Sequence, residues 1–355
     1  RDERTEEANE DAWDPGKFVA VASVPVVVRN PYNFYWGDIH AHTSYSDGSG
    51  YPIEAYTYAR DEAKLDFFAV TDHDEVLTDD EYADTIAQAE SFDESGRFVA
   101  LYGVERTNDF GHSCFYMTPV RATPYDADGF YRMLRENGIL GHFNHPWTPD
   151  LDMDWRNDFE SFHYSPEGDR VMAMVEVRDS IEEGCYIRML DNGWHVGAAG
   201  DRDAHEPEWG QGPTWTVALA KELSREGVLE ALWARRTYST ADRNMKLEFT
   251  LDGEDMGARI TRTAGRYDVG IVVDDPDEED VVESVDIFLD GKVAASMTPA
   301  DMMEPAAKKF SLARPMRFAP GNHYCFVRVA QAGGKTAWSS PIWVSAYRDT
   351  MGETH

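Results

Sequence analysis

Short apolar runs alternate with amphipathic segments through the first two thirds of the chain. The runs predict strands, because they are rich in β-branched and aromatic side chains and are bounded by polar or turn-forming residues. They lie at 34–40, 67–71, 97–103, 139–143, 171–177, 196–200 and 214–219. Helical segments are expected at 52–64, 79–93, 126–137, 181–192 and 224–236. This alternation is typical of an α/β protein in which helices cover a parallel sheet, either an open sheet or a barrel.

The pattern changes after about residue 243. Apolar positions there recur every second residue, and D-G, G-G and acidic turns interrupt the runs. Several such strands in succession predict an antiparallel β-sandwich of roughly 100 residues. The acidic segment 274–283 is expected to be a solvated loop, and the apolar run 18–28 a strand. The expected units are an acidic arm with a lead-in strand (1–33), an α/β domain (34–242) and a smaller sandwich (243–355).

The charge and composition exclude several classes of protein. The formal net charge is −33, and only 8 of the 33 basic residues are lysines. Such a surface repels phosphate backbones, so nucleic acid is not expected as the main partner. No apolar run approaches the ~20 residues that a membrane span needs. Three widely spaced cysteines exclude a disulfide-rich scaffold.

Two histidines and an aspartate follow the first predicted strand, in the stretch "GDIHAHTSYSDGSG". His40 and His42 are two residues apart, and side chains on a strand alternate between its faces, so both point the same way. The small polar loop that follows can bring Asp47 back over the same spot. Two imidazoles held in this way form a natural pair of metal ligands. A chance H-x-H at a strand end is the alternative for this stretch alone.

Other histidines also end or follow predicted strands. In a βα fold these ends converge, so distant sequence positions form one cluster. With three neighbouring acids, the candidate metal ligands are His40, His42, Asp47, His73, Glu105, His112, His145, Asp203 and His205. They are too many for one tetrahedral ion and favour two or three divalent ions bridged by a carboxylate such as Glu105. Imidazole and carboxylate ligands suit Zn, Mn or Fe.

The motifs "GDIHAHTSYSDG", "TDHD", "GVE", "NHP" and "GDRDAH", in this order, resemble those of the PHP (polymerase and histidinol phosphatase) superfamily of metal-dependent hydrolases. The resemblance covers about 36–240 and implies that 34–242 is a distorted seven-stranded (β/α) barrel with a trinuclear site at the carboxyl ends of its strands. The ligands that it implies are His40, His42, Glu105 and Asp203 for one ion, Glu105, His112 and His145 for a second, and Asp47, His73 and His205 for a third.

The C-terminal motifs suggest a particular branch. "ALWARRTYST", "LEFTLDGEDMGA" and "AWSSPIWV" resemble secreted or envelope-type PHP hydrolases with an appended β-sandwich, among them the carbaryl-hydrolase-like enzymes. This resemblance favours an extracellular or periplasmic location over a cytoplasmic one. The chain begins at Arg1 without methionine or a signal-like segment, so we expect any targeting peptide to be absent from it.

Polar residues beside the ligands are candidates for catalysis. Arg202 stands where the family often has a small hydroxyl residue, and like Arg106 it could stabilise an oxyanion or phosphate by paired hydrogen bonds. Balancing the nearby carboxylates is the alternative for both arginines. Asp74 and Asp201 could orient ligand histidines. Further candidates are Glu176 and Arg178 at a strand end and the aromatic residues Tyr45, Trp147 and Trp209 as pocket walls.

Three functions remain open on this evidence. A phosphoesterase is preferred, in which divalent ions make hydroxide available for attack on phosphorus. The same site could instead hydrolyse a small carbamate, ester or amide. A non-catalytic metal-binding module is the third, although the motifs lack no bridging ligand. Motifs of a serine hydrolase elbow, a phosphate loop and a dinucleotide fold do not occur in the sequence.

Overall fold

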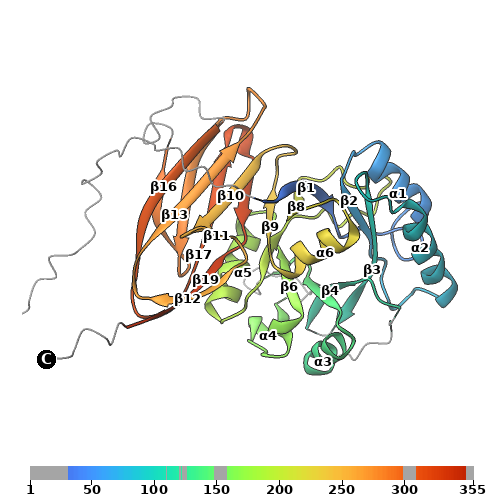
Figure 1. Ribbon diagram of the computed structural model, residues 1–355. Helices are drawn as coiled ribbons and strands as arrows, with labels where there is room; N and C mark the ends of the chain where they lie inside the picture. Colours follow the sequence, from blue (N-terminus) through green and yellow to red (C-terminus); the bar gives the residue numbers. More distant parts are fainter. Residues whose placement is uncertain are drawn as a thin grey trace, which may run out of the picture.

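The computed structural model in Figure 1 describes residues 31–108, 110–119, 121, 126–147, 158–298 and 309–348. It shows a mixed α/β protein in which strands predominate. The strand predicted at 18–28 and most of the predicted arm lie outside the described residues. None of the helices in the described ranges is long and apolar enough to cross a membrane.

The first part of the chain contains all the described α-helices. These are α1 (Pro52–Asp61), α2 (Asp79–Phe92), α3 (Ala127–Asn137), α4 (Phe159–Phe162), α5 (Ser180–Asp191) and α6 (Arg225–Trp233). The strands among them are β1 (Asn33–Asp38), β2 (Phe67–Val70), β3 (Val99–Asn108), β4 (Gly111–Tyr116), β5 (Leu140–Phe143), β6 (Met172–Glu176), β7 (Gly197–Ala199), β8 (Trp215–Ala220) and β9 (Thr237–Thr240).

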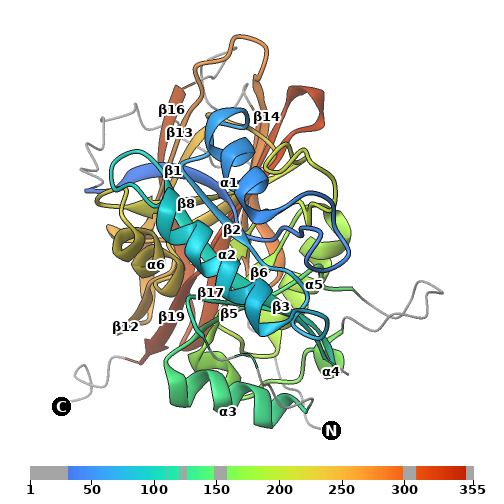
Figure 2. The same ribbon diagram turned by 90° about the vertical axis from the view of Figure 1, so that its right-hand side faces the viewer.

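Local signals set the ends of several helices. The Thr78 side chain accepts a hydrogen bond from the backbone N–H of Glu81, and the Glu81 carboxylate accepts one from the backbone N–H of Thr78. These two bonds form the capping box that starts α2. Asp126 caps α3, and Gly138 ends that helix in the left-handed conformation. Figure 2 shows α1 and α2 lying over β2 and β3, where their alanine and aromatic side chains form one core cluster with both strands.

The order of the strands corrects the prediction of a parallel sheet. The pairs β1–β2–β3 and β5–β6–β7 are parallel as expected. However, β4 runs antiparallel to both β3 and β5, and β8 runs antiparallel to β1. Only two residues separate β3 from β4 in the sequence, too few for the crossover connection that a parallel pair requires.

The closed seven-stranded barrel is not confirmed, because in the described residues no ladder of backbone hydrogen bonds joins β7 to β8 or β9. Hydroxyl groups from other segments form hydrogen bonds with the backbone at this edge of β7 instead. Thr237 Oγ1 donates to Ala198 O, and Ala198 N donates to Ser340 Oγ. A Cβ at Gly197 would come within 2.5 Å of Ser340 Oγ, so glycine leaves the space that this contact needs.

In the later part of the chain the regular elements of the described residues are strands, apart from one 3-10 turn at Ala332–Gly334. They are β10 (Lys246–Leu251), β11 (Glu254–Asp255), β12 (Arg259–Thr263), β13 (Gly265–Asp274), β14 (Val282–Leu289), β15 (Lys292–Met297), β16 (Lys309–Phe318), β17 (Gly321–Gln331), β18 (Thr336–Ser339) and β19 (Ile342–Tyr347). The segment between β13 and β14 is a loop, as the acidic stretch predicts.

Two sheets meet in this later part. The four-stranded sheet β11-β10-β13-β16 places alternate apolar residues against β14, β17 and β19 of the large sheet in one core cluster. A separate sandwich is not confirmed, because β18 pairs with β9 and the large sheet continues past the boundary expected at 242. The two parts of the chain are therefore joined by backbone hydrogen bonds.

Candidate metal centre

The fold brings all nine predicted ligands together. Their donor atoms form three groups, and within each group these atoms lie within 4.8 Å of one another. The groups are His40, His42, Glu105 and Asp203; Glu105, His112 and His145; and His42, Asp47, His73 and His205. The shared members Glu105 and His42 make the three groups one continuous cluster.

Backbone contacts between strand ends hold the cluster together. Ala41 and Ala204 form a parallel bridge, and His42 N donates to Ala204 O at 2.8 Å. This bridge places the H-x-H segment after β1 beside the D-x-H segment after β7. A second bridge joins His73 to Glu105. Convergence of strand ends thus assembles the site, as the sequence predicts.

Two of the ligands lie within strands and not after them. Glu105 belongs to β3 and His112 to β4, which pair in a hairpin. The strand predicted at 97–103 is therefore too short, and a further strand covers the segment of His112. His112 nevertheless lies with its Nδ1 only 3.1 Å from Glu105 Oε1.

The first group has the spacing of a tetrahedral metal site. His40 Nε2 and His42 Nε2 lie 3.2 Å apart, and each is 3.1–3.2 Å from Glu105 Oε2 and from Asp203 Oδ1. Ligands about 2.0–2.1 Å from a zinc ion are about 3.3–3.4 Å from one another in a tetrahedron. Asp203 Oδ1 is a buried atom that faces both imidazole nitrogens at these distances. The donor set therefore fits a divalent ion.

Glu105 faces two groups with its two oxygens. Oε2 lies toward the first group and 3.4 Å from His73 Nε2. Oε1 lies 3.1 Å from His112 Nδ1 and 3.3 Å from His145 Nε2. The residue is 1% exposed, so these contacts form away from solvent. Each oxygen of Glu105 thus faces a different group of candidate ligands.

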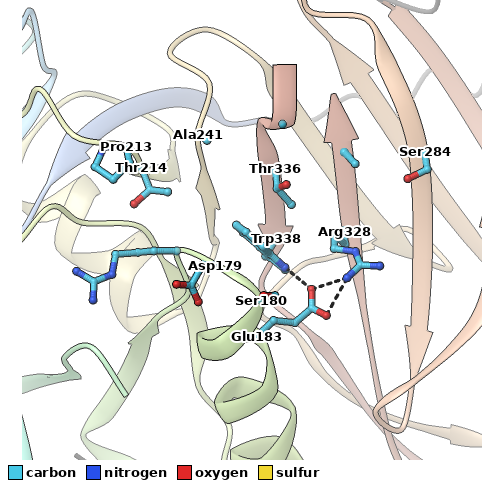
Figure 3. Close-up of a pocket in the computed structure, with 13 residues that line it drawn as sticks. Asp179, Ser180, Glu183, Pro213, Thr214, Ala241, Ser284, Arg328, Thr336 and Trp338 are labelled. Atoms are coloured by element: carbon cyan, nitrogen blue, oxygen red, sulfur yellow. Dashed lines mark hydrogen bonds and ion pairs between the residues drawn. The ribbon is translucent and has the colours of Figure 1, made fainter. Parts of the chain in front are cut away.

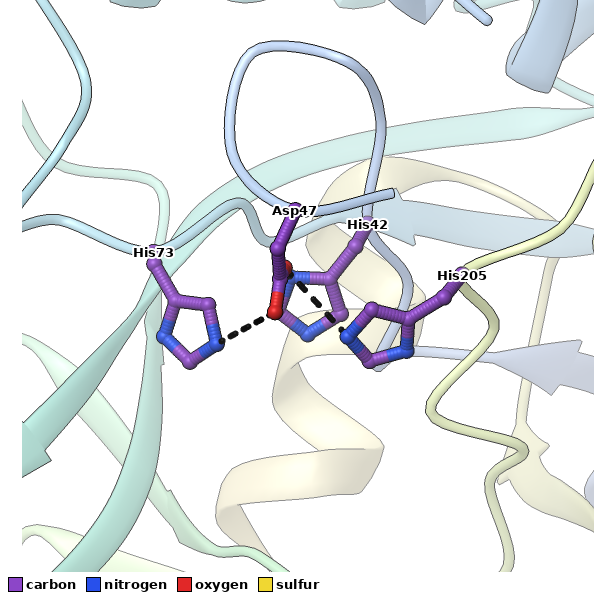
Figure 4. Close-up of side chains that lie close together, drawn as sticks. All are labelled: His42, Asp47, His73 and His205. Atoms are coloured by element: carbon purple, nitrogen blue, oxygen red, sulfur yellow. Dashed lines mark ion pairs between the residues drawn. The ribbon is translucent and has the colours of Figure 1, made fainter. Parts of the chain in front are cut away.

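The third group is only partly exposed, and its Asp47 lies between His73 and His205 (Figure 4). Asp47 Oδ1 is 3.3 Å from His205 Nε2, and Asp47 Oδ2 is 3.7 Å from His73 Nε2. His42 stacks on His205 with ring centroids 4.3 Å apart, but its Nε2 already faces the first group. A neutral imidazole offers one lone pair, so His42 serves one ion. Asp47 is 58% exposed, which leaves this group open to a substrate.

Buried polar side chains hold the ligands in position. Glu176 Oε1 lies 2.7 Å from His40 Nδ1, and its Oε2 accepts from His145 N at 2.7 Å. Asn144 Nδ2 donates to Glu105 Oε1 at 2.8 Å. Asp72 accepts from Thr43 N, Thr43 Oγ1 and Ser46 Oγ, and so fixes the loop that carries Asp47. Such partners orient metal ligands and tune their basicity.

The sequence indicated these supporting residues only in part. From the sequence, Glu176 is predicted, with Arg178, as a candidate site residue at a strand end. No role is predicted for Asp72 or Asn144. Both stand directly beside a ligand histidine, in "TDHD" and "NHP". That position was the available signal, but among so many acids it did not distinguish Asp72 from Asp74.

The predicted catalytic residues make contacts outside the ligand groups. Arg202 donates to Glu208 O at 2.8 Å and to Gln211 O at 3.1 Å, within its own loop. Asp74 pairs with Arg106 at 3.2 Å, and Asp201 accepts from Ile39 N. The described contacts of Asp74 thus link it to arginine, not to a ligand histidine; its catalytic role and that of Arg202 stay predictions.

The aromatic residues lie in different environments. Trp209 is 2% exposed, and its Nε1 donates to His42 O. It therefore supports the backbone under the ligands, and its expected place in a substrate pocket is wrong. Tyr45 donates its hydroxyl to Asp84 at 2.8 Å and packs against Tyr51. Trp147 stays a prediction.

Two ligands have an unusual backbone conformation. His145 has φ 27° and Asp203 has φ 56°, although neither is glycine. Positive φ costs a side-chain-bearing residue roughly 1–3 kcal/mol and persists only where surrounding contacts impose it. Such residues concentrate at functional sites. Both side chains belong to the groups of candidate ligands, so the strained backbone conformation directs their donor atoms toward the other members of these groups.

The charges of the cluster are strongly coupled. Burial acts to raise the pKa of Glu105, but the charge on His40 and hydrogen bonds from His112 and His145 hold it well below its usual value. Burial acts to lower the pKa of His42, and hydrogen bonds with Asp203 and Glu105 outweigh it and raise the pKa to about 9. Without cations His40, His42 and His145, whose pKa values are raised, thus bind protons that balance the carboxylates; a divalent ion would displace those protons.

Replacing Glu176 with glutamine is expected to weaken metal binding about tenfold or more, because His40 loses a charged partner on its Nδ1. Metal affinity can be measured by competition with a chromogenic chelator. Glu182→Gln is the matched control. Glu182 pairs with Arg178, which also contacts Glu176. Glu182 contacts none of the predicted metal ligands in the described structure. Equal affinities in the two variants would contradict a supporting role for Glu176.

Comparison with known proteins gives distant similarities. No protein-family model matches the chain. It is similar to an uncharacterized protein of Chlamydia muridarum, with 22% identity, 87% of this chain and 57% of the relative covered. A second uncharacterized protein, from Chlamydia pneumoniae, is 24% identical, with 88% of this chain and 57% of the relative covered. The chain spans less than two thirds of the length of these relatives.

Among solved structures the chain is similar to a two-domain protein of Bacteroides vulgatus ATCC 8482, described as containing a predicted PHP-like metal-dependent phosphoesterase. The identity is 20%, the TM-score is 0.49, and the alignment covers 85% of this chain and 92% of that chain. A likeness at this level does not establish an activity, which has to be inferred from the site.

Proposed function

We propose that this chain is a metal-dependent hydrolase that activates water at a centre of two or three divalent ions and cleaves phosphoesters of small molecules. The observation that carries the proposal is the position of Glu105, whose two buried oxygens face separate histidine groups. A bridging carboxylate of this kind is what a centre with more than one ion requires. The PHP-like motifs extend the proposal to a barrel-type fold and three ions.

The residues would divide the work by their position. The buried first and second groups would hold ions through Glu105, while the exposed third group would meet the substrate through Asp47, His73 and His205. Bound ions would act as Lewis acids and lower the pKa of coordinated water toward ~7. Zn, Mn and Fe are all compatible with these ligands. The cationic centre would also attract an anionic substrate despite the acidic surface.

A protein nucleophile is not part of the proposal. Cys114 lies beside the ligands, but it is fully buried, and burial raises its pKa to about 12. Its thiol therefore stays protonated at neutral pH and is inert. The Ser46 hydroxyl donates a hydrogen bond to Asp72, so it contributes to the structure of the loop that carries Asp47. Activated water is the nucleophile that agrees with both contacts.

A carbamate, ester or amide hydrolase is the second candidate. Tyr51 is 56% exposed and Val76 is 60% exposed, and they follow the loops that carry Asp47 and His73. Exposed apolar side chains that follow these loops in the sequence favour an uncharged substrate with an apolar leaving group. The resemblance to the carbaryl-hydrolase-like branch, and a location outside the cytoplasm, belong to this alternative as proposals.

The first experiment compares two substrates on the metal-replete protein. We would measure kcat/KM for bis(p-nitrophenyl) phosphate and for 1-naphthyl N-methylcarbamate, after loading with Zn, Mn or Fe, with a chelated sample as control. Chelator-sensitive turnover of the diester is the expected result. Preference for the carbamate would move the proposal to the carbon centre. Absence of turnover on both substrates with every metal would favour a metal-binding module.

A further inference from the structure

A second pocket lies apart from the metal ligands, between the start of α5 and strands of the later part of the chain (Figure 3). Its volume is about 470 Å³, within the roughly 300–1,000 Å³ typical of small-molecule sites. Residues 178–183, the segment before β8, and strands β14, β17 and β18 supply its walls. None of the nine predicted ligands lines it.

The two arginines of this pocket are already paired with carboxylates. Arg328 lies 2.8 Å from Glu183 and 2.7 Å from Asp286, and Glu183 also accepts from Trp338 Nε1 at 2.6 Å. Figure 3 shows the contacts of Glu183 with Arg328 and Trp338. Arg178 is paired with Glu182 at 2.6 Å. An anion would have to displace buried carboxylates from these arginines, so the pocket is not designed for a charged ligand.

Three hydroxyl groups of the pocket, by contrast, are available, whereas that of Thr214 donates to Asp201 O. Ser180, Ser284 and Thr336 line it, and within the described residues their hydroxyls have no hydrogen-bond partner. Asp179 uses Oδ1 to cap α5, and its Oδ2 has no partner in that part of the chain. Three groups that both donate and accept, with one free acceptor, match the hydrogen-bonding pattern of a polyol.

We propose that this pocket binds a neutral polyhydroxylated ligand, such as a monosaccharide, a disaccharide or an inositol. The site gains its polar contacts from free hydroxyls of both parts of the chain and excludes ionic groups through its paired arginines. The joined sheet at β9 and β18 holds the two walls together, so the pocket is formed before the ligand arrives. The site is separate from the metal centre, and its ligand need not be the hydrolysed substrate.

Ligand-observed NMR titration on the full chain tests the proposal with D-glucose, D-galactose, trehalose and myo-inositol. Saturable binding of at least one probe is expected, with and without chelator, since no metal ligand lines the pocket. Ser284→Ala and Thr336→Val should each weaken binding about fivefold, the effect of one hydrogen bond. Thr261→Val, an exposed threonine of β12 outside the pocket, is the matched control.

Several outcomes would overturn the proposal. No binding of any probe would do so, as would binding that chelator abolishes, which would place the ligand at the metal centre. D-Glucuronate or glucose 6-phosphate binding more than tenfold tighter than glucose would show that the pocket selects an anion. Unchanged affinity in both Ser284→Ala and Thr336→Val, with melting temperatures like the parent protein, would remove the pocket from the binding site.

Discussion

The kcat/KM of the Glu105→Gln variant on bis(p-nitrophenyl) phosphate is expected to fall more than about 100-fold. This exceeds the loss of about 10–100-fold that replacing a residue in contact with a metal ligand typically causes. The glutamine amide keeps the shape of the side chain, but the amide nitrogen cannot coordinate an ion, and the negative charge is gone. Because both oxygens of Glu105 face histidine groups, more than one ion should be affected. Metal content, measured by elemental analysis, is therefore expected to fall by at least one equivalent.

The Glu183→Gln variant provides the control for that experiment. Glu183 is also a largely buried carboxylate with several polar contacts, but its partners are Arg328 and Trp338. It should therefore keep its metal and its turnover even if its stability falls. Full metal content and full turnover in Glu105→Gln would disprove the bridging role and, with it, the multi-ion centre.

Removing the metal is expected to lower the melting temperature by about 10–20 °C at pH 8. An ion held at 100 times its dissociation constant stabilises the folded state by about 2.7 kcal/mol, and two such ions contribute about twice that amount. For a large domain, each kcal/mol corresponds to about 2–4 °C. Differential scanning fluorimetry of the chelated and the reloaded protein checks the size of this effect.

The loss on metal removal should also depend on pH. An unfolded histidine has a pKa near 6.5, whereas the carboxylates around His42 raise its folded pKa to about 9. The stability that its proton provides is complete below pH 6.5 and is lost as the pH rises through 9. The chelated protein should thus weaken between pH 6.5 and 9, while in the loaded protein ions replace the protons.

The lowered pKa of Glu105 and Asp203 acts in a different range. Their contribution is present above the ordinary carboxylate values and is lost only as the pH falls below them. It does not change between pH 6.5 and 9. The difference between the melting temperatures of the chelated and the loaded protein should therefore widen with pH in this window. The same difference should be smaller in the His42→Gln variant. Parallel curves would contradict the assignment.

Short-range information in the sequence predicts the helices well. The segments 52–64, 79–93 and 126–137 correspond to α1, α2 and α3 within a few residues at each end. Capping residues such as Thr78 and Asp126 act on the next turn of chain, so their effect can be predicted without knowing the fold. The period-two pattern of β13 likewise survives as alternating burial.

Strand pairing could not be predicted in the same way. The parallel sheet was inferred from the alternation of elements, but the antiparallel β4 depends on which strand edges meet. The open edge of β7 depends on Thr237 and Ser340, which come from segments far along the chain. Closure of a sheet is a long-range property, and local pattern does not encode it.

The sequence by itself predicted nine candidate metal ligands, because histidines are few and the candidates lie at or after the ends of predicted strands. It did not determine which acids support them, since one carboxylate among 66 looks like any other. Only the tertiary structure decided that Glu176 contacts His40, that Glu105 faces two groups, and that free hydroxyls of both parts line one pocket. Metal ligands are identified by the kind of donor atom, whereas supporting contacts and pockets depend on distances between remote segments.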